Sequence, residues 1–296
     1  MNLTSLTSLG CQLAFSTDSY IVEPIFFPGG NIGHLSVCGT VNDIAMSGAK
    51  PLYLSASFII EEGLPFEQLE AIVVSMAQTA KQAGVQIVTG DTKVAPRGKV
   101  DKLFINTCGI GVIPDSINWG AKQIQPDDVI IVSGTLGDHG AALLNIRENL
   151  GLDGHLVSDC DCLYPIVDAL LPLNGVRALR DATRGGVTAV LHEFATVSEC
   201  GFTLEESSLP INQEVQGVCE LLGLDPINFA NEGKLIAIVS KQDSQAALQA
   251  IKNTDIGRSA AIIGSVNSSG RIVVNNALGA SRPLELPITE PMPRIC

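Results

Sequence analysis

The sequence predicts a mixed α/β (α+β) fold in two domains, and three features of the chain lead to this prediction. Strand-like and helix-like patterns interleave along the whole chain, which is typical of layered α/β domains. The length of 296 residues suits two domains of ordinary size, each with its own core. A polar stretch with prolines, residues 114–128, interrupts the pattern. We therefore expect domains over residues 1–115 and 118–284, followed by a tail over 285–296.

The first domain is expected to contain strands on both sides of an amphipathic helix. The stretches "LYLSASFII" (52–60), "VQIVTGD" (85–91) and "LFINTCGIGVI" (103–113) have strand character. Residues 66–83 show an apolar repeat of helical spacing, and Gly84 is a typical helix end. The predicted apolar face of this helix consists of Phe66, Leu69, Ile72, Val73, Met76, Ala77, Ala80 and Ala83.

The second domain continues the alternation of strands and helices. Its predicted strands are 128–134, the start of 176–186, 234–240, and a closing pair at 259–266 and 271–276. Its predicted helices are 138–151, 187–197, 212–224 and 243–253. Both halves of the chain are therefore expected to be mixed α/β layers.

Charge and composition exclude several classes of function. A net charge of −13 leaves no basic surface for nucleic acid, so an anionic ligand would need metal ions or backbone N–H groups to hold it. No run of about 18 apolar residues predicts a membrane span. The opening "MNLTSLTSLG" has no signal-peptide pattern. Eight cysteines without a secretory signal favour a reducing cytosol, and hence a cytoplasmic location.

The cysteines fall into three groups. Cys160 and Cys162 in "SDCDC" are candidate metal ligands, but the chain has no C-x₂-C pair to complete such a site, so the sequence favours the absence of a metal there. Cys296 differs in its position at the very end of the chain. The remaining cysteines are expected to be small buried apolar residues: Cys11, Cys38, Cys108, Cys200 and Cys219.

Four aspartates are candidate Mg²⁺ ligands. They stand beside small or glycine-rich residues where strands are expected to end, and they are Asp18, Asp43, Asp91 and Asp181. Mg²⁺ is commonly held by one or two carboxylates together with substrate phosphates. Each aspartate could instead cap a turn or a helix. Their number beside glycine-rich turns favours metal binding.

Three glycine-rich turns are candidate phosphate-binding loops: "GDTKVAPRG" (90–98), "SGTLGDHG" (133–140) and "DATRGG" (181–186). Glycine permits the positive φ angles that let successive N–H groups surround an anion. None has P-loop or dinucleotide-binding spacing. Lys93 and Arg184 are candidate phosphate partners, although both could be solvated surface residues. The predicted nucleotide-binding residues are Asp91, Thr92, Gly137, His139, Thr183, Arg184, Gly185 and Gly186.

Two further features concern proton chemistry and the chain end. Glu232 in "NEGK" precedes an apolar strand and is a candidate general base, although an ordinary turn is an equal alternative. His34, His155 and His192 are expected to be structural or solvated. The tail contains Pro287, Pro291 and Pro293, which predicts a semi-extended flexible arm ending at Cys296.

These stretches together resemble the HypE family of hydrogenase maturation proteins. The resemblance rests on "TDSY", "FFPGGNIGHLSVCGTVNDIAMSGAKPLYLS", "EEGLP", "QIVTGDTKV", "GTLGDHG", "RDATRGG", "ANEGKL" and the terminal "PRIC", and it covers nearly the whole chain. The family belongs to the ATP-binding superfamily of aminoimidazole ribonucleotide synthetase and selenophosphate synthetase. The resemblance implies two PurM-like domains and a homodimer with ATP bound in a cleft.

The resemblance also implies a reaction and its residues. It implies a carbamoyl dehydratase that uses ATP and Mg²⁺ to convert a carbamoylated Cys296 into a thiocyanate, which supplies cyanide ligands to the iron of a [NiFe]-hydrogenase. The aspartates take the metal role, and Lys93 and Glu232 handle substrate and protons in one cavity. The implied partners are the carbamoyltransferase HypF and the iron-carrying HypC–HypD complex. We also expect the adjacent Arg294 to lower the pKa of the Cys296 thiol.

One departure from the family concerns the start of the chain. The family has a glycine-rich segment before the "TDS" strand, and the dozen residues found here do not supply it. This departure predicts weaker ATP binding and a dimer barrel that lacks a strand. A truncated, catalytically weak scaffold subunit therefore remains an alternative. A selenophosphate synthetase is a further alternative, but such an enzyme should carry its reactive cysteine in the N-terminal loop instead of at the C-terminus.

Overall fold

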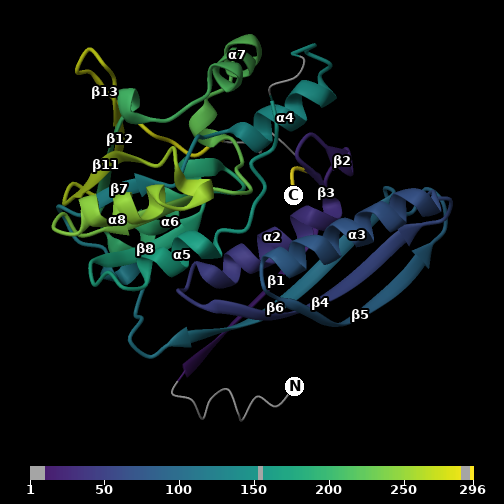
Figure 1. Cartoon of the computed structure of the whole chain (residues 1–296). Coiled ribbons are helices and arrows are strands. Elements are labelled where there is room, and N and C mark those ends of the chain that lie inside the picture. The colour runs from purple at the N-terminus through teal and green to yellow at the C-terminus, as the bar shows by residue number, and fades with distance from the viewer. Residues whose placement is uncertain (1–10, 153–155, 288–293) are drawn as a thin grey trace.

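The computed structural model describes residues 11–152, 156–287 and 294–296, and these form two domains that each contain a sheet and helices (Figure 1). The predicted mixed α/β class is therefore confirmed. The expectations for the opening ten residues, His155, Pro291 and Pro293 lie outside the described residues. Within those ranges, no helix combines the length and apolar content that a membrane crossing requires.

The first domain is a four-stranded sheet with helices on one face (Figure 1). The strand order is β1-β6-β4-β5, in which β5 runs parallel to β4 and the other neighbours are antiparallel. A short β-hairpin of β2 and β3 leads into α2. The elements are β1 (Cys11–Tyr20), β2 (Phe26–Phe27), β3 (Gly30–Asn31), α2 (Ile32–Ala45), β4 (Lys50–Glu61), α3 (Phe66–Gln82), β5 (Gln86–Ala95) and β6 (Leu103–Pro114).

Alternation along β6 sets the position of α2. Leu103, Ile105 and Thr107 face the helices and are buried, whereas the residues between them are half-exposed. Further along β6, a side chain on Gly109 would meet Ile44 of α2 at 2.4 Å. Glycine at this position therefore lets α2 lie directly on the sheet.

The sequence prediction missed α2 and misjudged one face of α3. Nearly every residue of α2 is buried, so the helix lacks the apolar and polar alternation by which amphipathic helices are recognised. In α3, Ile72, Met76 and Ala80 are buried as predicted, but Phe66 is 74% exposed. Thr79 is buried on this face although it is polar, and its hydroxyl bonds to Ser75 O.

The second domain is a seven-stranded sheet with the order β13-β12-β9-β11-β7-β10-β8 and helices on both faces. Residues of α6 pack on one face, and residues of α5 and α8 pack on the other. The strands are β7 (Val129–Val132), β8 (Val176–Asp181), β9 (Gly201–Glu205), β10 (Leu235–Val239), β11 (Ala261–Asn267), β12 (Ile272–Asn275) and β13 (Ser281–Pro283). The helices are α4 (Asp138–Arg147), α5 (Tyr164–Leu170), α6 (Gly186–Ser198), α7 (Gln213–Leu222) and α8 (Ser244–Lys252).

Both strands of the predicted closing pair form, as β11 and β12, but they do not pair with each other. Strand β9, which the sequence prediction missed, lies between β11 and β12 and pairs with both. The helix predicted over 138–151 ends earlier, at Arg147. These differences concern strand neighbours and element ends, which periodicity alone does not specify.

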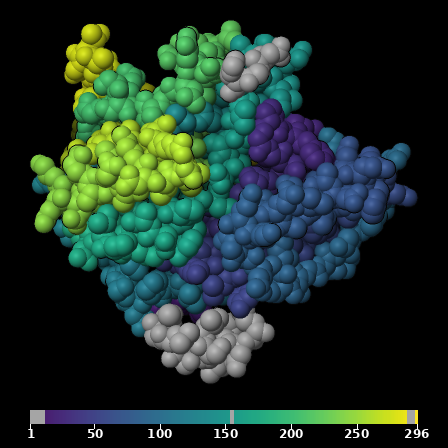
Figure 2. Space-filling model, in the orientation of Figure 1, coloured from purple at the N-terminus to yellow at the C-terminus, as the bar shows by residue number. Residues whose placement is uncertain are grey.

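The two domains pack directly against each other (Figure 2). Asn42 of α2 joins them, because its Oδ1 accepts the Leu163 N–H at 2.7 Å and its Nδ2 donates to Asp161 O at 2.9 Å. The segment 158–163, which enters α5, therefore crosses the first domain along α2.

Candidate active site around the C-terminal cysteine

The last three residues of the chain are docked inside the protein. The Ile21 N–H donates to Cys296 O at 3.0 Å, and the Glu23 N–H donates to Arg294 O at 3.3 Å, so the chain end lies alongside the segment that follows β1. Ile295 is only 1% exposed, and its carbonyl accepts a hydrogen bond from His139 Nε2 at 2.9 Å. The end of the predicted arm is thus bound at a defined site between the two domains.

The Cys296 thiol lies in a polar but half-buried environment. Arg184 Nη2 donates to its Sγ at 3.2 Å. The pKa of the thiol is raised to about 12, mainly by burial and then by the charge of Glu232, while Arg184 lowers it. The expectation that Arg294 lowers this pKa is wrong, because Arg294 forms an ion pair with Asp101 instead.

Glu232 is the buried carboxyl group of this site. Glu232 is only 2% exposed, and within the described ranges its Oε1 has no hydrogen-bond partner. Burial raises its pKa well above the ordinary value, and the negative charges of Asp159, Asp181, Asp18 and Asp43 raise it further. The site therefore favours the protonated carboxyl and leaves one oxygen free for a ligand.

Three of the four predicted metal aspartates lie near Glu232, as their mutual effects show. The pKa of Asp181 is raised to about 6, mainly by burial and also by the charge of Asp43, while Arg180 lowers it. Arg180 Nη1 lies 3.0 Å from Asp181 Oδ1 and 3.8 Å from Asp43 Oδ1. Only Asp181 ends a strand as predicted, since Asp18 lies within β1 and Asp43 lies in α2.

These carboxylates fit Mg²⁺ in type and in clustering. Glu232 and the three aspartates repel one another, and a divalent cation would relieve that repulsion. Among the described residues, no three of the predicted aspartates bring carboxylate oxygens within 4.8 Å of one another. This spacing suits a metal that takes one or two carboxylates and fills its shell with phosphate oxygens and water.

Asp91 and Lys93 lie far from the Glu232 site in the folded chain. They are on β5, three strands from β1 in the sheet, which corresponds to about 14 Å. Asp91 is paired with Ser57, on the sheet face opposite Asp18 and the helices. Lys93 Nζ contacts Asp91 Oδ2 at 2.7 Å, with both side chains largely exposed. Within one chain, the structure therefore does not bring Lys93 or Asp91 to Glu232.

Asn231 joins the glycine-rich turns, and the sequence analysis had not assigned it a role. Its Oδ1 accepts the Gly137 N–H at 2.8 Å, and its Nδ2 donates to Ala182 O at 2.9 Å. Gly137 has a φ of +85°, and Gly185 and Gly186 have φ of +76° and +57°. These positive φ angles are the ones predicted for the turns, and they begin α4 and α6. Thr183 and Arg184 lie just before α6, and Arg184 contacts Cys296.

His139 was predicted to bind nucleotide, but its ring is already engaged within the chain. It is fully buried, with Nδ1 at 2.7 Å from Ser158 Oγ and Nε2 bonded to the tail. Phe27 packs edge-on against the ring. The contacts of His139 thus hold the docked tail.

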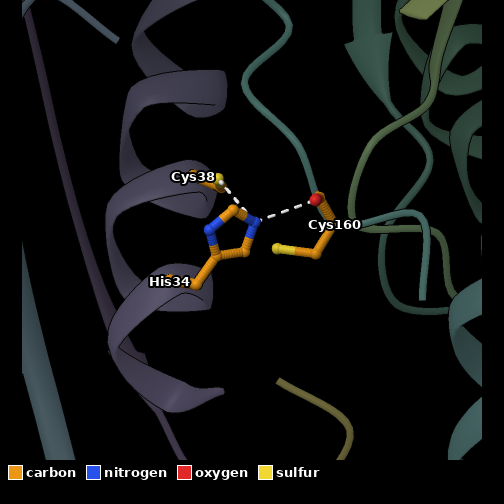
Figure 3. A group of neighbouring side chains, drawn as sticks. All are labelled: His34, Cys38 and Cys160. Carbon is orange, nitrogen blue, oxygen red and sulfur yellow. Dashed lines mark hydrogen bonds between the residues drawn. The ribbon is translucent and has the colours of Figure 1, made fainter. Parts of the chain in front are cut away.

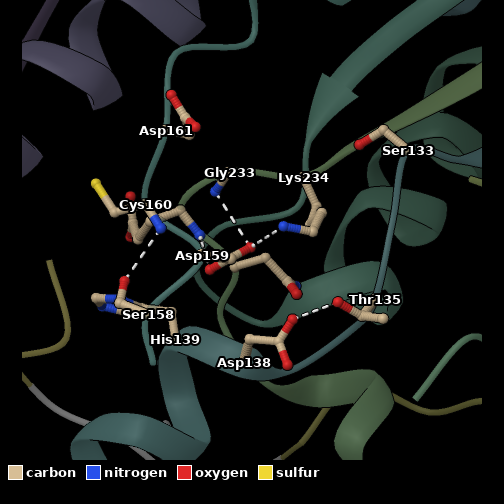
Figure 4. Close-up of polar contacts among 12 residues, drawn as sticks. Ser133, Thr135, Asp138, His139, Ser158, Asp159, Cys160, Asp161, Gly233 and Lys234 are labelled. Carbon is tan, nitrogen blue, oxygen red and sulfur yellow. Dashed lines mark hydrogen bonds and ion pairs between the residues drawn. The ribbon is translucent and has the colours of Figure 1, made fainter. Parts of the chain in front are cut away.

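Asp159 and Lys234 form a buried ion pair behind Glu232 (Figure 4). Lys234 Nζ lies 3.1 Å from Asp159 Oδ2, and Asp159 also accepts the backbone N–H groups of Glu232 and Gly233. A side chain on Gly233 would lie 1.8 Å from Asp159 O, so only glycine fits there. The sequence analysis missed Asp159, because no local pattern connects it to a turn more than 70 positions away.

Two family profiles match the chain. The N-terminal domain of AIR synthase related proteins matches residues 5–113, and the C-terminal domain of the same proteins matches residues 125–275. The predicted PurM-like architecture is therefore confirmed.

Named relatives share much of the sequence. The chain is 57% identical to carbamoyl dehydratase HypE of Escherichia coli K12 over 296 residues, which is the whole of this chain and 88% of that relative. It is 48% identical to carbamoyl dehydratase HypE of Rhizobium leguminosarum bv. viciae, over 97% of this chain and 83% of that relative.

Solved structures of HypE proteins also superpose closely on this chain. A crystal structure of E. coli HypE superposes with a TM-score of 0.98 at 56% identity, over all of this chain and 92% of that chain. A HypE structure in complex with ATP has a TM-score of 0.92 at 46% identity, over 96% and 87% of the two chains. A HypE–HypF complex gives a TM-score of 0.91 at 47% identity, over 93% and 90%. With a docked C-terminal cysteine beside a buried glutamate on this fold, the chain belongs to the HypE family of hydrogenase maturation proteins, the carbamoyl dehydratases.

Proposed function

We propose that this chain converts an S-carbamoyl group on Cys296 into a thiocyanate, at the expense of ATP. The observation that carries the proposal is the position of Cys296, whose half-buried thiol accepts a hydrogen bond from Arg184 and lies in the field of the buried Glu232. A carrier group attached to this sulfur would be partly shielded from water, which slows hydrolysis of a reactive intermediate. The similarity to carbamoyl dehydratases supports the same reaction.

The carbamoyl group would come from a carbamoyltransferase of the HypF type. A solved relative is described as a HypE–HypF complex, which supports this partner. For loading, the tail has to leave its seat. This breaks the backbone hydrogen bonds that join Arg294, Ile295 and Cys296 to Ile21, Glu23 and His139. It also breaks the contacts of Arg147 with Arg294 O, of Arg184 with the Cys296 thiol and of Arg294 with Asp101.

ATP would activate the carbamoyl oxygen, which is otherwise a poor leaving group. The γ-phosphoryl group passes to that oxygen, and phosphate then departs with it as the C≡N bond forms. One carbamoyl thioester and one ATP thus give one thiocyanate, ADP, phosphate and a proton. Bound Mg²⁺ would supply charge neutralisation for phosphoryl transfer, held by Asp18, Asp43 and Asp181. The proposal of ATP is supported by a solved relative in complex with ATP.

Glu232 is the residue best placed to take the N–H proton. A carboxylate whose pKa is raised is a stronger base in its ionised form than a solvated one. The free Oε1 is available to accept that proton. The Asp159–Lys234 pair holds the backbone of Glu232 and so positions its side chain.

We also propose a homodimer through the uncovered face of the four-stranded sheet. Among the described residues, this face carries exposed apolar side chains, including Leu13, Phe15 and Ile59 at 38%, 68% and 44% exposure. Asp91 and Lys93 lie on the same face. A second copy would bury this apolar surface and could bring its own Lys93 to the Glu232 site.

After dehydration, the cyano group on Cys296 would pass to the iron of a HypC–HypD complex.

Mass spectrometry of the C-terminal peptide tests the reaction. After incubation with HypF, carbamoyl phosphate and ATP, the peptide should gain about 43 Da and then show about 25 Da, as a carbamoyl adduct gives way to a cyano adduct. Cys296→Ala should abolish both masses, whereas Cys219→Ala, a change at a buried cysteine of α7, should leave them unchanged. Adducts on another cysteine of the wild-type chain would overturn the proposal. A loaded carbamoyl group that never dehydrates would favour the scaffold alternative.

A further inference from the structure

A group of sulfur and nitrogen ligands lies outside the site described above. His34 and Cys38 stand one turn apart on α2, and Cys160 approaches them from the segment that crosses α2 (Figure 3). The potential ligand atoms of these three residues all lie within 4.8 Å of one another. Cys162 Sγ lies 3.4 Å from Cys38 Sγ and provides a fourth donor. In the ranges that the structure describes, no other group of three or more His, Cys, Asp or Glu side chains converges in this way.

We propose that His34, Cys38, Cys160 and Cys162 bind a zinc ion that fastens segment 158–162 to α2. Three sulfurs and one imidazole nitrogen form the Cys₃His set of structural zinc sites. Around a tetrahedral zinc ion, neighbouring sulfurs lie about 3.8 Å apart, and a sulfur and a nitrogen lie about 3.6 Å apart. The observed distances are 3.4 Å between Cys38 Sγ and Cys162 Sγ and 3.7 Å between Cys38 Sγ and His34 Nε2. These two distances are close to those around such an ion, and the Cys160 thiol lies within 4.8 Å of the ligand atoms of His34 and Cys38.

The surroundings of His34 suit a metal ligand. Its Nδ1 lies 2.9 Å from Thr79 Oγ1, and its Nε2 lies 2.9 Å from Cys160 O and 3.7 Å from Cys38 Sγ. Without a metal, Nε2–H can donate to Cys160 O while the Thr79 hydroxyl donates to Nδ1. With a metal on Nε2, the proton would sit on Nδ1 and be accepted by Thr79 Oγ1, whose own hydrogen goes to Ser75 O at 2.9 Å. A hydrogen bond to the second imidazole nitrogen is the usual partner of a metal-bound histidine.

The cluster also has a route to solvent. A cavity of about 370 Å³ is lined by His34, Thr79 and Cys162 and carries the acidic side chains of Asp161 and Asp255. Cys38 and Cys160, by contrast, are buried behind it. A cation can therefore reach the donors through an opening whose charge attracts it.

The expected consequence is structural support for the Cys296 site. Segment 158–162 includes Asp159, which holds the backbone of Glu232, and Ser158, which contacts His139. A metal bound to Cys160 and Cys162 would restrict the movement of both contacts relative to α2. This consequence rests on the proposed function, whereas metal binding itself does not.

Metal titration of the full chain tests the site. The reduced, chelator-treated protein, kept in excess Mg²⁺ to occupy the carboxylates, should bind one equivalent of Zn²⁺ in competition with a chromophoric chelator. Co²⁺ should give the charge-transfer absorption of thiolate ligands and the visible bands of a tetrahedral ion. His34→Gln, Cys38→Ser, Cys160→Ser and Cys162→Ser should each weaken binding by about 100-fold or more, and Thr79→Val by about 10–100-fold.

Matched changes separate the site from the other thiols and from misfolding. Cys219→Ser and Cys296→Ser should retain full affinity for Zn²⁺. The cluster variants in chelator should keep the circular dichroism spectrum and unfolding midpoint of the chelator-treated wild type, while Zn²⁺ should raise the midpoint of the wild type alone. The proposal is overturned if the reduced wild-type chain binds no Zn²⁺ or if the cluster variants bind it as tightly as wild type. A Cys38–Cys162 disulfide in the isolated protein, with no metal uptake after reduction, would also overturn it.

Discussion

The carboxyl groups around Cys296 are buried or half-buried and repel one another, whereas Asp91 and Lys93 on β5 face solvent and neutralise each other. Burial raises the pKa of Glu232 and Asp181, while the hydrogen bond from Lys93 lowers the pKa of Asp91. The first region stores unfavourable electrostatic energy that a metal and a nucleotide would relieve. The charges of the second region are already paired in the isolated chain. This contrast indicates that the reactive groups lie around Cys296 and that Asp91 and Lys93 of β5 take part only when a second copy of the chain covers this face.

The largest expected effect comes from removing the buried base. Glu232→Gln keeps the size of the side chain but removes its ability to accept a proton, so thiocyanate formation should fall by about 10²–10⁴-fold. The carbamoyl adduct on Cys296 should then accumulate, because loading does not need this carboxyl. Quantitative mass spectrometry of the C-terminal peptide measures both species. Normal dehydration by this variant would remove Glu232 from the proton-transfer step.

Mixed dimers would show whether β5 joins the Glu232 site from a second chain. Lys93→Ala and Glu232→Gln should each be inactive alone. If each site combines Glu232 of one chain with Lys93 of the other, a 1:1 mixture should regain about a quarter of wild-type activity, since half of the dimers have one intact site. A mixture that stays inactive although it exchanges subunits would show that the two residues act within one chain or that Lys93 has no role.

Breaking the buried ion pair should cost several kcal/mol of stability. Lys234→Met leaves Asp159 charged and buried, and loss of one partner of such a pair typically costs about 3–5 kcal/mol. Urea unfolding measures this, with the exposed Lys241→Met as a control that should change little. The double change Asp159→Asn with Lys234→Met should cost less than the two single changes added together. Additive costs would show that the pair is not coupled.

The raised pKa of Asp181 predicts a smaller, pH-dependent effect. The folded protein keeps this proton up to about pH 6, whereas the unfolded chain releases it near the ordinary aspartate pKa of 3.8. Between these values the native state binds more protons, so stability should fall as pH rises from about 4 to 6, by roughly 3 kcal/mol at most, and then level off. Asp181→Asn should flatten this slope in urea unfolding at pH 4–7, whereas the exposed Asp255→Asn should not. An unchanged slope in Asp181→Asn would contradict the assignment.

Much of the fold was predictable from local pattern. The strands at β4, β5 and β6 and the helices α3, α6 and α8 have the alternation or the apolar repeat that the two periods require. The turns before α4 and α6 were predicted from their glycines, and the positive φ angles found there agree with that prediction. Helices α2 and α5 and strand β9 were not predicted. Helix α2 is buried on nearly all sides, and such a segment shows no periodicity to recognise.

The candidate site was predictable in its residue types but not in its grouping. Asp18, Asp43, Asp181, Glu232 and Arg184 were all named from sequence, and the fold gathers them around Cys296. His139 was predicted to bind nucleotide, and in this structure its ring bonds to the tail. Asp159 and Asn231 were not assigned roles, since their contacts are to turns that are distant in sequence or to backbone atoms that no side-chain pattern reveals.

The amino-acid order alone established the alternation of strands and helices, the glycine turns and a family resemblance that ends at the terminal cysteine. These features depend on neighbours within a few residues or on motifs that can be read directly. Only the tertiary structure decided that Cys296 is seated beside Glu232, that Lys93 lies on the opposite face of the sheet, and that Cys38 meets Cys162 across 124 positions. Such contacts depend on which strands pair and how the helices pack. Strand pairing and helix packing are decided by the burial of the whole core and not by any local stretch of sequence.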